Sequence, residues 1–173
     1  MVTKSADMIE EYKGIVLVVD DTPTNLNVLF SYLRSGGFKV LVAQTGENAL
    51  KSAEYAQPDL ILLDILMSGI DGFETCRRLK ENHQTKNIPV IFMTALSDSI
   101  NKVRGFELGA VDYVTKPIQK EELIARIQTH NSIEKSRHNL VEQNAIQQQQ
   151  PEQEKLLSKL SERIRDSLDV NFI

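Results

Sequence analysis

Five short apolar runs divide the first two thirds of the chain, and each is followed by apolar residues at helical spacing. Each run is too short for a helix and is bounded by polar or turn residues, which is typical of a strand buried on both faces. Strands that alternate with helices predict an α/β fold with a doubly wound parallel sheet. The predicted strands are Ile15–Val19, Phe38–Ala43, Asp59–Asp64, Pro89–Thr94 and Val111–Val114.

The segments between these runs carry signals for the beginning and end of helices. Thr22 and Pro23 precede a helical pattern of apolar residues that Gly36 and Gly37 end. We expect the remaining helices to begin after Thr45, at Asp71, after Ser97 or Asp98, and near Gln119.

Polar side chains gather where four of the five predicted strands end. Asp20 and Asp21 follow the first strand, Asp64 ends the third, Thr94 ends the fourth, and Lys116 follows the fifth. Open parallel sheets place their binding sites at the carboxyl ends of the strands. Each residue also has an ordinary structural explanation, as a cap, a strand end or a solvated loop residue. Their occurrence together, at the same end of different strands, favours a site.

Three carboxylates in one place repel one another, and a divalent cation offsets that repulsion. Oxygen ligands alone favour a hard ion such as Mg²⁺, which keeps some of its waters and leaves room for a phosphate oxygen. Asp64 is then both a metal ligand and a candidate nucleophile, because carboxylates form aspartyl phosphates. Lys116 offers a positive charge and Thr94 a hydroxyl donor to a transferring phosphoryl group.

The sequence from about Lys13 to about Asn131 resembles the receiver domain of two-component response regulators, the family of the bacterial chemotaxis response regulator. The resemblance implies a flavodoxin-like sheet with strand order 2-1-3-4-5. The stretches that carry it are Leu17–Asp21, Asp64–Met67 with Asp71–Gly72, Met93–Ala95, and Gly109–Pro117.

The resemblance also assigns the metal site. It implies that Asp64 is the phosphoacceptor and that Asp21 coordinates Mg²⁺ directly, with Mn²⁺ as an alternative ion. Asp20 is expected to act through metal-bound water, and the backbone carbonyl of Leu66 is expected to be a further ligand.

The same resemblance assigns the switch. It implies that Lys116 pairs with the phosphoryl group and that the Thr94 hydroxyl moves toward it. Tyr113 is the aromatic side chain expected to turn inward when Thr94 moves. The Lys116–Pro117 peptide bond is expected to be cis, which the bond before a proline permits.

One departure from the family pattern lies just after Asp64. Ser68 stands at the position where the family usually has proline, and Gly69 follows it. No proposed ligand or nucleophile is changed, so we expect phosphorylation to be retained. The departure affects the rigidity of this loop and the choice of kinase.

Composition excludes several other classes. The net charge of −4 gives no electrostatic basis for direct contact with nucleic acid. The single cysteine, Cys76, cannot form an internal disulfide and fits a reducing compartment. No apolar run is long enough to span a membrane. Residues 1–13 form a polar N-terminal tail without the apolar segment of a secretory signal, so a cytoplasmic protein is expected.

The composition changes after Asn131, so we predict a receiver domain at 14–131 and a helical or coiled-coil linker at 132–173. This segment is rich in Gln and Glu, and no core remains for its apolar residues, so packing on a second copy is expected. Pro151 either begins a new helix or kinks one long helix that extends the last receiver helix. The apolar stripe consists of Ile133, Leu140, Leu157, Leu160, Ile164 and Leu168.

The end of the chain, Leu160–Ile173, is similar to signalling linkers that lead into GAF-type sensory domains. We therefore expect it to lead to an output or sensory domain. The leading hypothesis is a phosphoacceptor that receives phosphate from a cognate histidine kinase or phosphotransfer protein. It is a switch with only intrinsic autophosphorylation and autodephosphorylation activity, rather than a metabolic enzyme.

Two other functions fit parts of the sequence. One is a constitutive dimerisation scaffold, in which the receiver fold is a docking platform that does not depend on phosphorylation. The other is a metal-dependent phosphohydrolase that uses Asp64. The phosphohydrolase is the weaker hypothesis, because the position two residues on, Leu66, is not an acid or base.

Overall fold

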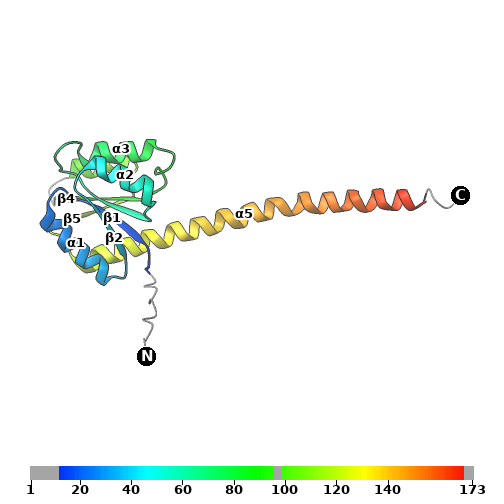
Figure 1. Ribbon diagram of the computed structural model, residues 1–173, viewed down its shortest axis with the longest axis horizontal. Helices are drawn as coiled ribbons and strands as arrows, with labels where there is room; N and C mark the ends of the chain where they lie inside the picture. Colours follow the sequence, from blue (N-terminus) through cyan, green and yellow to red (C-terminus); the bar gives the residue numbers. More distant parts are fainter. Residues whose placement is uncertain (1–11, 96–98, 170–173) are drawn as a thin grey trace, which may run out of the picture. The chain divides into compact units, whose positions relative to one another are not determined.

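The computed structural model describes residues 12–95 and 99–169 and contains a five-stranded parallel sheet (Figure 1). The strand order is β2-β1-β3-β4-β5, so the predicted α/β fold and strand order are confirmed. Ser97 and Asp98, the expected helix caps, lie outside the described residues. The strands are β1 (Ile15–Val19), β2 (Lys39–Ala43), β3 (Leu60–Asp64), β4 (Val90–Ala95) and β5 (Asp112–Lys116).

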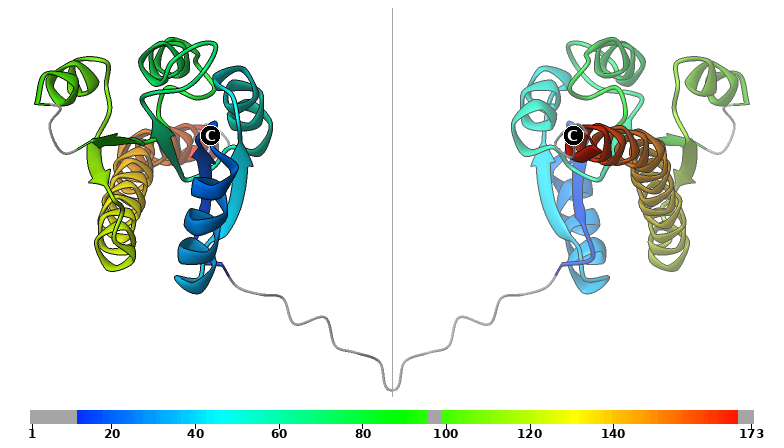
Figure 2. Two further views of the ribbon diagram at one scale, coloured as in Figure 1. Left: turned by 90° about the vertical axis from the view of Figure 1, so that its left-hand side faces the viewer. Right: turned by 90° about the vertical axis from the view of Figure 1, so that its right-hand side faces the viewer.

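Helices cover both faces of the sheet, and each face has its own apolar core (Figure 2). On one face, α1 (Pro23–Ser35) and the beginning of α5 (Lys120–Asp169) pack on the sheet through buried residues such as Leu33 and Leu123. On the other face, α2 (Gly46–Ala56) and α3 (Gly72–Glu81) supply Ala49, Ala53, Phe73 and Leu79. The helix α4 (Ser99–Glu107) packs near β4.

The central strand β3 is buried along its whole length, as its uninterrupted apolar sequence predicts. β5 differs from the prediction: it begins at Asp112 and includes Lys116. Parallel pairing continues to the end of both strands, with Thr94 beside Thr115 and Ala95 beside Lys116. Strand pairing therefore holds the lysine backbone at the carboxyl edge of the sheet.

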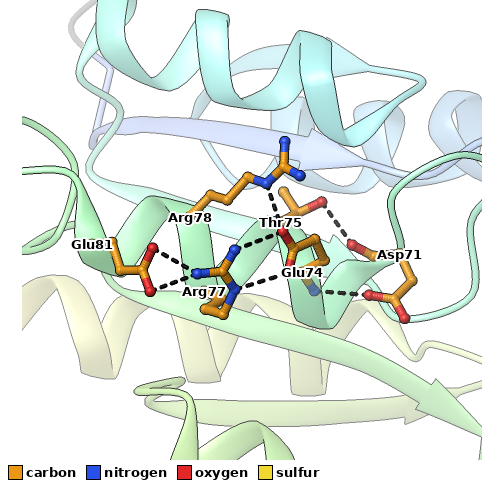
Figure 3. Close-up of polar contacts among 6 residues, drawn as sticks. All are labelled: Asp71, Glu74, Thr75, Arg77, Arg78 and Glu81. Carbon is orange, nitrogen blue, oxygen red and sulfur yellow. Dashed lines mark hydrogen bonds and ion pairs between the residues drawn. The ribbon is translucent and has the colours of Figure 1, made fainter.

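Asp71 begins α3 as its N-cap residue (Figure 3). Its carboxylate accepts a hydrogen bond of 2.8 Å from the backbone N–H of Glu74, and its carbonyl accepts one of 2.7 Å from the buried Thr75 hydroxyl. Arg77 forms ion pairs with Glu74 and Glu81 on the exposed side of this helix. The Asp71-Gly72 pair thus fixes the point at which the loop after β3 becomes a helix.

We expect Asp71→Ala to lower the free energy of unfolding by about 1 kcal/mol, because a helix N–H loses its side-chain acceptor. Asp71→Asn keeps an acceptor at the same position, so its free energy of unfolding should be close to that of wild type. Urea denaturation of the three proteins measures both differences. Equal stability of the Ala and Asn variants would contradict the capping role.

The chain divides into two units, Met1–Asn131 and Ser132–Ile173. α5 begins in the first unit and continues into the second, and it runs through Pro151 rather than beginning anew there. In the second unit, large apolar side chains are exposed at Ile133, Leu140, Val141, Ile146, Leu156, Leu157, Leu160 and Ile164. No helix in the described ranges combines the length and hydropathy needed to cross a membrane.

Candidate functional site

Three carboxylates meet at the carboxyl edge of the sheet. Asp20 and Asp21 follow β1, and Asp64 is the last residue of β3, the neighbouring strand. One oxygen from each side chain can be chosen so that all three lie within 4.8 Å of one another. Asp20 and Asp64 are buried, whereas Asp21 is partly exposed. The sheet therefore brings these predicted residues together.

Lys116 reaches this cluster from the end of β5, across the intervening strand β4. Its Nζ lies 2.9 Å from Oδ2 of Asp64 and 3.3 Å from Oδ2 of Asp20. Burial lowers the pKa of Lys116, but the hydrogen bond and charge of Asp64, with the charge of Asp20, outweigh this effect and raise it. The ammonium group therefore stays protonated. The Lys116–Pro117 bond is cis, as expected.

Asp20 is fully buried, and neighbouring donors satisfy its charge. The Asn25 side-chain amide lies 3.2 and 3.0 Å from its two oxygens, and the backbone N–H of Thr22 donates at 2.8 Å. This contact was not predicted from the sequence. The available signal was an amide side chain in the first turn of the helix that follows an Asp pair.

Asp21 is held from the loop after β3. The backbone N–H of Ser68 donates to Asp21 Oδ2 at 2.9 Å, and the Ser68 hydroxyl donates to the same oxygen at 3.2 Å. The Ser68 backbone N–H is the main cause that lowers the pKa of Asp21. This contact could not be predicted from local sequence patterns, because the two residues are 47 positions apart along the chain.

The pKa of Asp64 is shifted in the opposite direction from that of Asp21. Burial raises its pKa, and the nearby charge of Asp20 adds to the rise, while the hydrogen bond and charge of Lys116 oppose it without cancelling it. Without a cation, the protein's own groups therefore disfavour a second buried negative charge. An added cation would relieve this cost.

The remaining predicted residues surround the carboxylates. The side chain of Leu66 is 73% exposed. Thr94 is buried, and its hydroxyl lies 3.3 Å from the carbonyl of Ala95. Thr94 and Tyr113 line the same small cavity behind the sheet edge. The Tyr113 ring packs edge-on against Phe106, with ring centroids 5.9 Å apart.

Residues 16–128 match the model of the response regulator receiver domain. This chain belongs to that family. Receiver domains are signalling switches of two-component systems rather than metabolic enzymes, so the predicted class is confirmed. The carboxylate cluster at the sheet edge therefore lies within a receiver domain.

Two curated relatives and one solved structure illustrate the similarity. The chain is 42% identical over 114 residues to the response regulator PleD of Caulobacter vibrioides, covering 66% of this chain and 25% of PleD. It is 42% identical over 112 residues to PhoP of Bacillus subtilis, the alkaline phosphatase synthesis transcriptional regulatory protein, covering 65% of this chain and 46% of PhoP. The chain thus spans less than half the length of either relative.

The solved structure is the receiver domain of the sensor histidine kinase PA1611 from Pseudomonas aeruginosa PAO1. It is 29% identical, with a TM-score of 0.64, and the match covers 69% of this chain and 98% of that one. That structure has a magnesium ion coordinated in its active site cleft.

In metal-free solution, we expect Asp64→Asn to raise the free energy of unfolding of this receiver at neutral pH. The folded-state pKa of Asp64 lies above the ordinary value of 3.8, so ionisation destabilises the fold as pH rises through that window. The gain should vanish in acid, where the carboxyl is protonated in both states. Urea denaturation in EDTA from about pH 3 to about pH 8 measures it.

Asp112→Asn serves as a control of opposite sign. Burial raises the pKa of Asp112, but hydrogen bonds from His130, the backbone of Tyr113 and Arg126 outweigh it and lower the pKa overall. Its stabilisation is present above the ordinary value and is lost as pH falls through the lowered pKa. Asp112→Asn should therefore destabilise at neutral pH. If Asp64→Asn raised the free energy of unfolding equally at every pH, this would contradict the electrostatic explanation.

Proposed function

We propose that this receiver is the phosphoacceptor of a two-component phosphorelay and that Asp64 carries the phosphoryl group. The observation that supports this most is the position of Asp64. Its carboxylate lies at the end of β3, 2.9 Å from the Lys116 ammonium group and close to two further carboxylates. A nucleophile, a counter-charge and candidate metal ligands therefore share one edge of the sheet.

The donor set fits Mg²⁺, with Mn²⁺ as an alternative. It consists of hard carboxylate oxygens close enough to share one ion, and a single lysine offsets their charge. In this proposal Asp21 and Asp64 bind the ion directly, the Leu66 backbone carbonyl is a further ligand, and Asp20 acts through water. Bound Mg²⁺ would neutralise charge on the phosphoryl oxygens during transfer.

The chain's own residues orient and stabilise the transfer. An Asp64 oxygen forms a bond to phosphorus as the P–N bond of a phosphohistidine breaks, and the electron pair of that bond stays on the imidazole nitrogen. Lys116 pairs with the transferred group, and the Thr94 hydroxyl moves toward it. Tyr113 then turns into the space that Thr94 leaves, which changes the surface formed by α4, β5 and α5.

Phosphorylation by acetyl phosphate tests the site directly. We expect Mg²⁺-dependent incorporation that EDTA abolishes, because the acidic cluster needs a cation before it accepts another anion. Asp64→Asn should reduce incorporation at least about a hundredfold, since an amide is not a nucleophile here. Phosphate-affinity electrophoresis or intact mass spectrometry measures the modified fraction.

Asp59→Asn is the matched control, because Asp59 lies just before the opposite end of β3 and accepts a hydrogen bond from the Ile15 backbone. It should be phosphorylated as wild type is. Undiminished phosphorylation of Asp64→Asn, or phosphorylation independent of divalent cation, would contradict the proposal.

We further propose that this chain acts in the cytoplasm. Its proposed partners are a cognate histidine kinase or phosphotransfer protein and a second copy of this chain. The second unit carries apolar side chains that are about half exposed or more, including Leu157, Leu160 and Ile164. Residues at this spacing fall on one side of a helix, where pairing with another helix would remove them from water. The signal would pass through α5 by rearrangement of the dimer.

Light scattering after gel filtration, with and without beryllofluoride, tests the dimer. We expect a species of twice the 19.6 kDa chain mass in at least one state. Leu160→Glu with Ile164→Glu should shift it toward monomer, because charge would enter the apolar contact. Lys155→Glu, on the opposite side of the helix, should leave it unchanged. An unchanged wild-type monomer in both states would remove the dimer from the proposal.

A constitutive scaffold remains the alternative favoured by the exposed apolar side chains of the second unit. It predicts a dimer without any dependence on the acidic cluster. Beryllofluoride binding separates the two functions, because a scaffold need not bind it and a phosphoacceptor must do so with Mg²⁺.

A further inference from the structure

Within the described residues, Ser68 alone donates to Asp21 from both its backbone N–H and its side-chain hydroxyl. The two bonds, of 2.9 and 3.2 Å, reach the same oxygen, Oδ2. The donor and the acceptor are 47 residues apart and lie in the loops that follow two neighbouring strands. The contact therefore joins the loop after β3 to the end of β1.

This loop also carries the Leu66 carbonyl. Its ends are fixed: the Ile65 N–H bonds the Met93 carbonyl at 3.4 Å, and the Gly72 N–H bonds the Ile65 carbonyl at 2.9 Å. Between them, Gly69 has a φ of +82°, which glycine adopts without strain. Within this exposed turn, Ser68 is the residue that is hydrogen-bonded to Asp21 after β1.

We propose that Ser68 is a positioning residue for the metal site and that it uses both donors to orient Asp21 and to hold the Leu66 loop against it. This inference rests on the proposed function, because it concerns the same cation. Ser68 itself is not a ligand in this proposal.

The geometry leaves Asp21 able to bind a cation. A carboxylate has about four lone-pair positions, and the two Ser68 bonds use Oδ2. On Oδ1, the Thr22 hydroxyl makes a long contact of 3.4 Å. Hydrogen bonds to a ligating carboxylate set its direction, and Mg²⁺ accepts little departure from octahedral geometry. Ordering Asp21 before binding therefore lowers the cost of assembling the site.

Substitutions at Ser68 can remove the two donors in steps. Ser68→Thr keeps both, Ser68→Ala removes the hydroxyl, and Ser68→Pro removes the hydroxyl and the N–H together. Ser68 is exposed, so these changes leave the core intact. Ser31→Ala is a matched control, because the Ser31 hydroxyl bonds a carbonyl of its own helix, α1, at 3.0 Å.

Titration of each unphosphorylated 173-residue variant with MgCl₂, followed by ¹H–¹⁵N NMR, measures the Kd for the metal alone. We expect Ser68→Thr and Ser31→Ala to match wild type. Ser68→Ala should raise the Kd about two- to fivefold, since water replaces part of an exposed bond. Ser68→Pro should raise it about tenfold or more, as loss of an outer-shell partner does elsewhere. Urea denaturation in EDTA should show little change in stability, which separates positioning from folding.

The two proposals fail in different ways. If wild type binds Mg²⁺ but Ser68→Ala or Ser68→Pro binds as tightly or more tightly, the role of Ser68 is overturned and the metal site stands. If wild type shows no saturable shift with Mg²⁺, the metal site falls and the role of Ser68 falls with it. A graded loss from Thr through Ala to Pro supports the proposal.

Discussion

Repulsion among three carboxylates at one edge of the sheet is the constraint on which the rest of the site depends. Asp20, Asp21 and Asp64 lie together because β1 and β3 are parallel neighbours whose carboxyl ends coincide. Different hydrogen-bond donors of the surrounding chain compensate these charges. Asn25 and the Thr22 backbone satisfy Asp20, whereas Ser68 satisfies Asp21.

Asp64 is the carboxylate whose ionised form remains unfavourable. It ends a strand that is buried throughout, and the Lys116 ammonium group does not fully offset the cost of its burial. Burial by apolar packing therefore makes ionisation of the Asp64 carboxyl unfavourable, and the protein's own groups do not fully compensate for this. Under the proposed function, a bound cation would relieve this cost, and the free energy of binding would then be available to rearrange neighbouring residues.

The strand β5 connects this site to α5. Lys116 ends the strand at the carboxylates, and Asp112 begins it at the other end. There, both Asp112 oxygens lie within hydrogen-bond distance of Arg126, at 3.0 and 2.9 Å, and the His130 ring lies 3.1 Å away. Because Arg126 and His130 belong to α5, one short strand contacts both the acidic cluster and the helix that continues into the second unit.

The sequence by itself determined the fold class and the identity of the acidic residues. Five apolar runs that alternate with amphipathic helices predict a parallel sheet, and the polar residues at the carboxyl ends of its strands then share one edge. The boundaries of β5 were less well predicted, because pairing with β4 extends the strand to Lys116. Pro151 left two helical arrangements open, and the structure has the continuous one.

Only the tertiary structure decided which groups compensate the buried charges. The bonds from Ser68 to Asp21 and from Asn25 to Asp20, and the reach of Lys116 across β4, depend on distances between strand ends. Apolar periodicity is a local property and can be read along the chain. A hydrogen bond between residues 47 positions apart depends on sheet order and loop conformation, which the whole fold sets.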